Sequence, residues 1–115
     1  MQYMLLIHSN EAAMQAAPRD AIERMHAAYM AYTEALAKSG VVVNGNRLRP
    51  TSATTTVRVV DGKTQVLDGP YAETKEQLGG YFLIEVPDLD AALSWAARCP
   101  GSQHGIVEVR PIWAM

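Results

Sequence analysis

The segment of residues 2–8 constrains the fold of this chain most, because it predicts a strand with two largely apolar faces. One face would carry Tyr3, Leu5 and Ile7, and the other would carry Met4, Leu6 and His8. Such a strand belongs near the centre of a sheet that is covered on both sides. A domain of 115 residues has too few helices to cover two faces, so we expect a second subunit to bury one of them.

Two amphipathic helices are expected. The first would run from Pro18, after a poor N-cap at Ala17, to Gly40 at its left-handed end. Apolar residues recur along it at spacings of three and four, at Ile22, Met25, Tyr29, Tyr32 and Leu36. The second would begin at the N-cap Asp88 and end at Pro100-Gly101. Its buried stripe would be Leu89, Ala92, Leu93 and Ala96.

Further strands are predicted between and after these helices. They are Val41–Val43, with a bulge or turn at residues 44–46, then Ala53–Val60, Thr64–Leu67, Tyr81–Val86 and Ile106–Ile112. Asp61-Gly62 predicts a tight hairpin. Without this hairpin, at about 53–68, the element order is β-α-β-β-α-β, which is the split βαβ or ferredoxin-like order. We therefore predict one α+β domain over residues 1–115 with an inserted β-hairpin, and a homodimer in which two sheets pack face to face.

Composition excludes several classes of protein. The chain is 49% apolar and 19% charged, as in ordinary globular proteins, and its net charge of −2 argues against nucleic acid as a partner. No apolar run approaches the length of a membrane span, and no leader pattern precedes the first strand, so a cytoplasmic protein that binds no membrane is expected. The single cysteine, Cys99, is expected to be a buried helix residue. The three histidines have no metal-ligand spacing, so neither a metal nor another cofactor is predicted.

The stretch from Asp68 to Tyr81 joins two predicted strands and is unusually rich in distinctive residues. It combines a carboxylate, a rigid Gly69-Pro70 pair, an aromatic ring, further charges and a Gly79-Gly80 exit. This stretch resembles the YCII-related family, in the branch named for its DGPF motif. Residues 3–7, 88–96 and 105–112 match the family pattern as well, so the resemblance covers nearly the whole chain. The motif's phenylalanine is Tyr71 here, which keeps the ring and adds a hydroxyl.

The resemblance carries its own implications. It implies a dimeric α+β barrel of ferredoxin-like subunits. The wider family includes small enzymes thought to use a histidine–aspartate pair in a cleft. Some members of the DGPF branch look to be encoded beside alternative sigma factors, which implies a link to transcriptional regulation.

Asp68 is the first candidate for acid–base chemistry. Gly69-Pro70 would fix its backbone at a strand end, where a partly buried carboxylate would have a raised pKa and act as a base. The alternative is an aspartate that accepts hydrogen bonds from its own turn. His104, just before the last strand, and His8, at the end of the first strand, are the candidate catalytic partners of Asp68.

Four residues are candidates for contact with a substrate: Tyr71, Glu73, Tyr81 and Arg110. Arg110 shares a strand face with Glu108, and it would either pair with a neighbouring carboxylate or bind a substrate carboxylate through two hydrogen bonds. The tyrosines would be apolar walls or core residues. Glu73 would order the loop as part of an ion pair or meet a polar ligand.

Three hypotheses follow. The first is a cofactor-independent lyase or isomerase that transfers protons between a histidine and Asp68 on a small polar or aromatic substrate. The second is a non-catalytic dimer that binds a metabolite or a protein partner, in a regulatory role. The third is a scaffold in which the motif is purely architectural.

Overall fold

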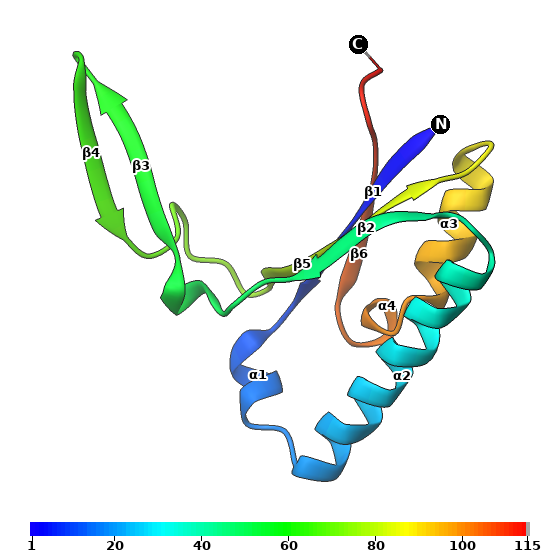
Figure 1. The fold of residues 1–115 in the computed structure, drawn as a ribbon. Coiled ribbons are helices and arrows are strands. Elements are labelled where there is room, and N and C mark those ends of the chain that lie inside the picture. Colours follow the sequence, from blue (N-terminus) through cyan, green and yellow to red (C-terminus); the bar gives the residue numbers. More distant parts are fainter. Residues whose placement is uncertain (115) are drawn as a thin grey trace.

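The computed structural model describes residues 1–114 and contains a four-stranded antiparallel sheet with helices on one face (Figure 1). Its strands are β1 (Gln2–Ser9), β2 (Val42–Arg47), β5 (Gln77–Glu85) and β6 (Ile106–Pro111), in the spatial order β2-β5-β1-β6. The two long apolar strands, β1 and β5, therefore lie at the centre, as expected for strands that carry apolar residues on both faces. The prediction of an α+β fold with an antiparallel sheet is confirmed.

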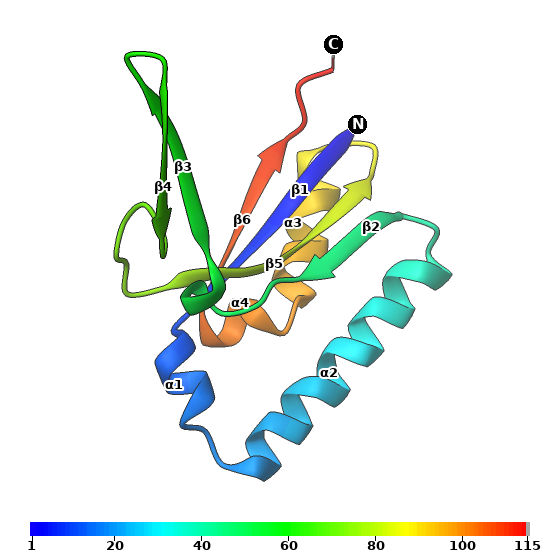
Figure 2. The ribbon, with the colours of Figure 1, turned by 60° about the vertical axis from the view of Figure 1, so that its left-hand side comes forward.

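Helices α2 (Arg19–Lys38) and α3 (Leu89–Arg98) cover the same face of the sheet (Figure 2). Two shorter helices, α1 (Glu11–Gln15) and α4 (Gly101–His104), and the 3-10 turn η1 (Thr51–Ala53) lie in the connections. Helix α2 begins one residue later than expected, with Pro18 at the N-cap and no capping side chain. Among residues 1–114, no helix is both long enough and apolar enough to cross a bilayer.

The hydrophobic core lies between the sheet and these two helices. Its buried members are Tyr3, Leu5, Ile7, Tyr32, Leu36, Ile84, Val86, Ala92, Ala96 and Cys99. Leu5, Leu36 and Ile84 are completely inaccessible to solvent. The Tyr32 ring meets Phe82 and Trp95 edge to face, and its hydroxyl donates to the Trp95 carbonyl at 2.7 Å, so the buried phenol has a polar partner.

The stripe predicted for α3 is only half correct. Ala92 and Ala96 are buried, but Leu89 and Leu93 are 47% and 46% exposed, and Trp95 and Ala91 pack on the core instead. The small alanines form the face toward the sheet, and the rotation of the helix about its axis then moves the leucines to its edge. Ile22, at the start of the α2 stripe, is likewise 48% exposed. Cys99 is buried as predicted, but it caps α3 rather than lying within it.

Strands β2 and β5 are longer than predicted. Residues 44–46 continue β2 past a register shift between Val42 and Asn44, and β5 begins at Gln77, so Gly79-Gly80 lies within a strand. Close packing explains why residues 45 and 80 are glycines. A Cβ at Gly45 would lie 2.6 Å from the Phe82 ring, and a Cβ at Gly80 would lie 2.9 Å from the Asn46 carbonyl oxygen.

The predicted hairpin forms a second, two-stranded sheet from β3 (Thr55–Val60) and β4 (Lys63–Asp68), here called the arm. Asp61 and Gly62 both have positive φ, as a tight hairpin turn requires. The arm projects away from the main sheet on the side opposite the helices (Figure 1). Five of its apolar side chains are therefore exposed: Val57, Val59, Val60, Val66 and Leu67.

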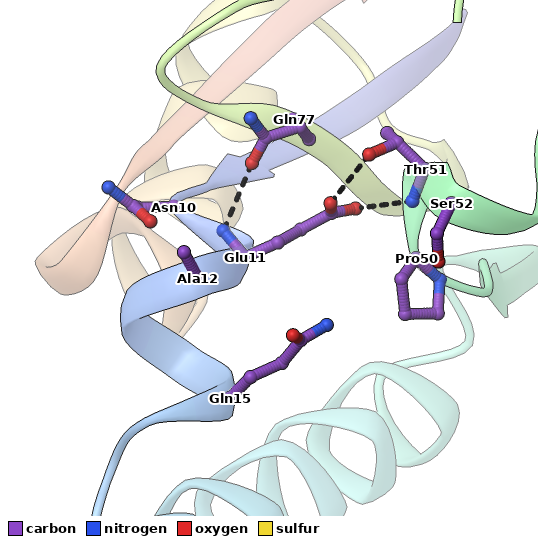
Figure 3. A pocket seen from close by; sticks show the side chains of 8 residues that line it. All are labelled: Asn10, Glu11, Ala12, Gln15, Pro50, Thr51, Ser52 and Gln77. Atoms are coloured by element: carbon purple, nitrogen blue, oxygen red, sulfur yellow. Dashed lines mark hydrogen bonds between the residues drawn. The ribbon is translucent and has the colours of Figure 1, made fainter. Parts of the chain in front are cut away.

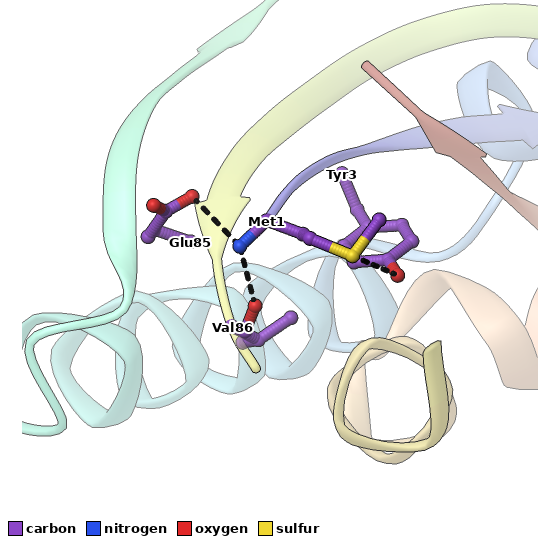
Figure 4. A network of polar contacts seen from close by, with 4 residues as sticks. All are labelled: Met1, Tyr3, Glu85 and Val86. Carbon is purple, nitrogen blue, oxygen red and sulfur yellow. Dashed lines mark hydrogen bonds and ion pairs between the residues drawn. The ribbon is translucent and has the colours of Figure 1, made fainter. Parts of the chain in front are cut away.

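The start of β1 is tied to the end of β5 (Figure 4). The Met1 amine donates to the Val86 carbonyl at 3.0 Å and lies 3.6 Å from the Glu85 carboxylate. The Tyr3 hydroxyl reaches the Met1 sulfur at 3.8 Å. These contacts hold the register that pairs Gln2 with Glu85, and this register sets which β1 residues face away from the helices.

Three weakly acidic side chains, two phenols and a thiol, lie in or beside the core and should make the stability of the fold sensitive to alkaline pH. Burial raises the pKa of Tyr29, Tyr32 and Cys99. Above roughly pH 8.5 to 10 the unfolded chain loses these protons while the folded chain keeps them, so the free energy of unfolding falls as pH rises. We expect thermal melts to show a falling Tm between about pH 8 and pH 10.5. The fall should be smaller in Tyr29→Phe, and equal slopes in the two proteins would contradict this origin.

Candidate functional site

The face of the sheet away from α2 and α3, here called the open sheet face, combines apolar and ionisable side chains. It carries Met4, Leu6, His8, Tyr81, Leu83, Glu108 and Arg110. Alternation places them there, because the neighbouring residues Leu5, Ile7 and Ile84 are buried against the helices. In the register of the sheet, Leu6 lies opposite both Tyr81 and Glu108. The side chains of Tyr81, Leu6 and Glu108 therefore form one row across β5, β1 and β6, with a phenol at one end and a carboxylate at the other.

His8 and Glu108 form the closest ionisable pair on this face. The Nε2 atom of His8 lies 2.6 Å from Oε1 of Glu108, which projects from the neighbouring strand β6. The Nε2 atom is shielded from solvent and makes no well-angled hydrogen bond to any described residue, although the Glu108 carboxylate lies beside it. The His8 side chain as a whole is 25% exposed. The contact places a carboxylate directly beside the imidazole of His8.

Tyr81 and Arg110 flank this pair. The Tyr81 hydroxyl accepts a hydrogen bond from Asn46 Nδ2 at 2.9 Å, which orients the phenol on β5. Arg110 lies two residues beyond Glu108 on the same face of β6, opposite Met4. It is exposed, and within residues 1–114 it makes no ion pair. The face therefore offers an imidazole beside a carboxylate, a phenol and an exposed guanidinium, which together suit a small polar or anionic molecule.

The structure brings together three of the predicted site residues, His8, Tyr81 and Arg110, and adds Glu108 to them. It does not bring Asp68 to a histidine within one chain. Asp68 ends β4 on the arm, is exposed and has no hydrogen bond from its side chain among the described residues. His104 ends α4 and is also exposed.

Tyr71 and Glu73 follow the arm and are both exposed, Tyr71 to 88%. The turn between them and Asp68 is fixed by two hydrogen bonds. Gly69 N–H donates to the Thr54 carbonyl at 2.7 Å, and the Thr56 hydroxyl donates to the Gly69 carbonyl at 2.6 Å. Gly69 has a φ of 101°, which favours glycine. The turn at Gly69-Pro70 is thus held by hydrogen bonds, but Asp68 before it is exposed in the single chain and not partly buried as expected.

A polar pocket of about 230 Å³ lies where the arm joins the domain (Figure 3). Its central residue is Glu11, whose carboxylate accepts hydrogen bonds from the Thr51 N–H at 2.9 Å and the Thr51 hydroxyl at 2.7 Å. The Glu11 N–H donates to Gln77 Oε1 at 3.0 Å. Both carboxylate oxygens are therefore occupied, and Glu11 joins α1, η1 and β5 at the root of the arm. A second hollow, a shallow groove of about 520 Å³, runs along α2 beside His26 and Met30.

Gly105 sets the approach of β6 to the site. A Cβ at this position would overlap the His8 carbonyl oxygen and would lie 3.1 Å from the Ser9 Cα. We expect Gly105→Ala to displace β1 from the α4–β6 connection and to lower the free energy of unfolding by about 2 kcal/mol.

Gly79→Ala is the matched control for Gly105→Ala. A Cβ at Gly79 would meet nothing closer than 3.9 Å, so this variant should keep nearly all of the stability. Urea titration of the two variants is the measurement. Equal losses in both would contradict the close-packing argument.

Sequence reasoning placed Glu108 and Arg110 on one strand face but did not join Glu108 to His8. The sequence did contain a signal for this contact, because simple alternation puts both His8 and Glu108 on the strand faces that point away from the core. Their contact depends on the β1–β6 register, which places Leu6 opposite Glu108 and His8 opposite Ile106. Glu11 was missed because its role depends on Thr51, 40 residues away in the sequence.

Three kinds of comparison relate this chain to known proteins. The model of the YCII-related domain matches residues 1–115. An uncharacterized protein of Rhizobium meliloti (strain 1021) is 37% identical over 114 residues, which is 97% of this chain and 92% of the relative. Among solved structures, the 5-chloro-2-hydroxyhydroquinone dehydrochlorinase TftG of Burkholderia phenoliruptrix AC1100, in complex with 2,5-dihydroxybenzoquinone, aligns with a TM-score of 0.56. That alignment covers 98% of this chain and 94% of TftG at 16% identity, so it bears on the fold.

Proposed function

Because this chain belongs to the YCII-related domain family, we propose that it is a small-molecule enzyme whose acid–base centre is the His8–Glu108 pair on the open sheet face. The observation that carries the proposal is the 2.6 Å approach of His8 Nε2 to the Glu108 carboxylate. We also assign the chain to the DGPF-motif branch, on Asp68-Gly69-Pro70-Tyr71.

The chemistry follows from how the pair is arranged. Because Nε2 lies beside the Glu108 carboxylate, we place the ring proton on Nε2, and Nδ1 of His8 is then the ring nitrogen that accepts a proton from substrate. The carboxylate then stabilises the imidazolium that forms, and the proton returns to a different atom or to a leaving group. This cycle describes a lyase or isomerase step. Arg110 would bind an anionic oxygen of the substrate, and Tyr81 would donate a hydrogen bond from its hydroxyl.

The open sheet face needs a cover for this chemistry, because charge pairs are weak in open water. We propose that a second copy supplies it, with the two sheets face to face in a dimeric α+β barrel of ferredoxin-like, split βαβ subunits. The strand order β2-β5-β1-β6 and the two helices on one face fit such a subunit. Met4, Leu6 and Leu83 would supply apolar contacts between the copies.

Small oxygenated aromatic compounds are the substrate class that we propose. A guanidinium and a phenol beside the apolar side chains Met4, Leu6 and Leu83 suit a planar ring with ionised oxygen substituents. The structural neighbour TftG is a dehydrochlorinase of a chlorinated hydroxyhydroquinone, which is a small aromatic molecule of this kind. At 16% identity the likeness to TftG supports the fold alone, so the proposed substrate class rests on the side chains of the open sheet face.

The second candidate is a non-catalytic dimer that binds a metabolite or a protein partner, with a regulatory role linked to sigma factors. The observation that favours it is the solvent exposure of Asp68 in the single chain. Under this alternative the open sheet face would bind a ligand without turning it over.

The test uses a panel of hydroxybenzoates, hydroquinones and 2,5-dihydroxybenzoquinone. Bound compounds are detected by thermal shift, because a ligand that binds the folded state raises Tm, and turnover is followed by ultraviolet absorbance. For any compound that is converted, we expect His8→Gln and Glu108→Gln each to lower kcat by at least about a hundredfold. Glu34→Gln, which removes an exposed carboxylate on α2, is the control and should keep full activity.

The two candidates give different results in this experiment. Binding without conversion, with equal affinity for wild type and His8→Gln, would favour the binding module. Full conversion by both the His8→Gln and the Glu108→Gln variants would refute the proposed centre.

A further inference from the structure

We propose that the arm of one copy lies along the open sheet face of the second copy and brings Asp68 and Tyr71 to the partner's Arg110 and His8–Glu108 pair. This inference rests on the proposed function, in which two open sheet faces meet. It assigns a role to the arm, and each site then contains residues from both chains.

The first argument is the exposure of apolar side chains on the arm. Val57 and Val66 lie opposite each other in the hairpin and are 61% and 60% exposed, and Val59, beside them on the same face, is 64% exposed. An isolated two-stranded hairpin is at best marginally stable in water. Clusters of exposed β-branched side chains of this kind mark contact surfaces.

The second argument is that hydrogen bonds at its root hold the arm away from its own domain. Its root is held by the Glu11–Thr51 hydrogen bonds and by the Leu48 N–H, which donates to the Gly79 carbonyl at 2.8 Å. The base of the hairpin is held by the Gly69–Thr54 hydrogen bond. Figures 1 and 2 show the arm diverging from the sheet on the side of the open sheet face. A fixed root and this direction favour a partner outside the chain.

The third argument identifies that partner as a second copy. The chain has two apolar surfaces on the same side, the arm and the open sheet face. A two-fold axis can place the arm of each copy on the open sheet face of the other copy. Their charges are complementary as well. Asp68 on the arm and Arg110 on the sheet each lack an ion-pair partner among residues 1–114. Across the two-fold axis they would neutralise each other twice.

Paramagnetic broadening between copies tests this arrangement. Cys99 is fully buried, so a nitroxide reagent will label a cysteine introduced as Ala72→Cys, which lies on the exposed turn beside Tyr71. The nitroxide-labelled chain is mixed with ¹⁵N-enriched chain that lacks the introduced cysteine and carries no nitroxide. We expect the amide signals of Met4, Leu6, His8 and Leu83 to broaden in the ¹⁵N copy. A label at Ala28→Cys, on the exposed side of α2, is the control and should leave these signals sharp.

The outcomes separate the two proposals. A monomer by light scattering would overturn the pairing of sheets and this inference together. A dimer whose open sheet face is not broadened by the Ala72 label would overturn the inference alone and leave the proposed function standing.

A charge exchange tests the same contact without labels. Asp68→Arg and Arg110→Asp should each raise the dissociation constant of the dimer about tenfold. The double variant Asp68→Arg/Arg110→Asp should return it to within about twofold of wild type, because the pair is restored with reversed sign. Additive losses in the double variant would refute the pairing.

Discussion

Leu36→Ala should lower the free energy of unfolding by about 3 kcal/mol and Tm by roughly 10 °C or more. Leu36 is completely buried on α2 and packs into the cluster formed with Leu5 and Ile84 of the two central strands. The substitution removes three buried carbons and leaves a cavity that the sheet cannot close, because its strands are fixed by hydrogen bonds on both sides. Urea titration monitored by circular dichroism measures the loss.

Leu93→Ala is the matched control for Leu36→Ala. Leu93 is the same residue type on the other long helix, but it is 46% exposed, so its loss should cost less than about 1 kcal/mol. Similar losses in the two variants would contradict the placement of the core between α2 and the sheet.

If the protein forms the dimer that we propose, Leu6→Asp should convert it into folded monomers. Leu6 lies in the middle of the open sheet face, between Tyr81 and Glu108, and in a face-to-face dimer it would be covered by the second copy. A two-fold interface contains the substitution twice, and each uncompensated buried carboxylate costs about 3 kcal/mol, so the dissociation constant should rise by several orders of magnitude. Light scattering at micromolar concentration measures the mass.

Met30→Asp is the control for this substitution. Met30 is 61% exposed on α2, on the helical side of the molecule, and its replacement should leave the proposed dimer intact. A Leu6→Asp variant that keeps both its circular dichroism spectrum and the mass of a dimer would contradict the pairing of open sheet faces.

The order of elements and the buried face of β1 followed from the sequence, because apolar alternation and helical spacing are local signals. Tyr32 and Leu36 were predicted on the α2 stripe and are buried. The alternation in residues 2–8 correctly assigned Tyr3, Leu5 and Ile7 to one face. Local patterns of this kind determine which face of an element meets the core.

The features that the sequence did not predict all depend on contacts between distant segments. The exposure of Leu89 and Leu93 depends on how closely α3 approaches the sheet. The His8–Glu108 contact depends on the β1–β6 register, and the direction of the arm depends on the Glu11–Thr51 hydrogen bonds at its root. The pairing of Asp68 with a histidine stays a prediction, since within one chain the arm holds Asp68 away from the sheet.

Mapping where a compound from the aromatic panel binds tests the account most directly. A two-dimensional NMR titration of ¹⁵N-labelled protein reports the position of the bound compound through the amide signals that shift. The account predicts that the shifts cluster on the open sheet face, at Leu6, His8, Tyr81, Glu108 and Arg110. Shifts confined to the pocket around Glu11 or to the groove along α2, with those five signals unmoved, would contradict it.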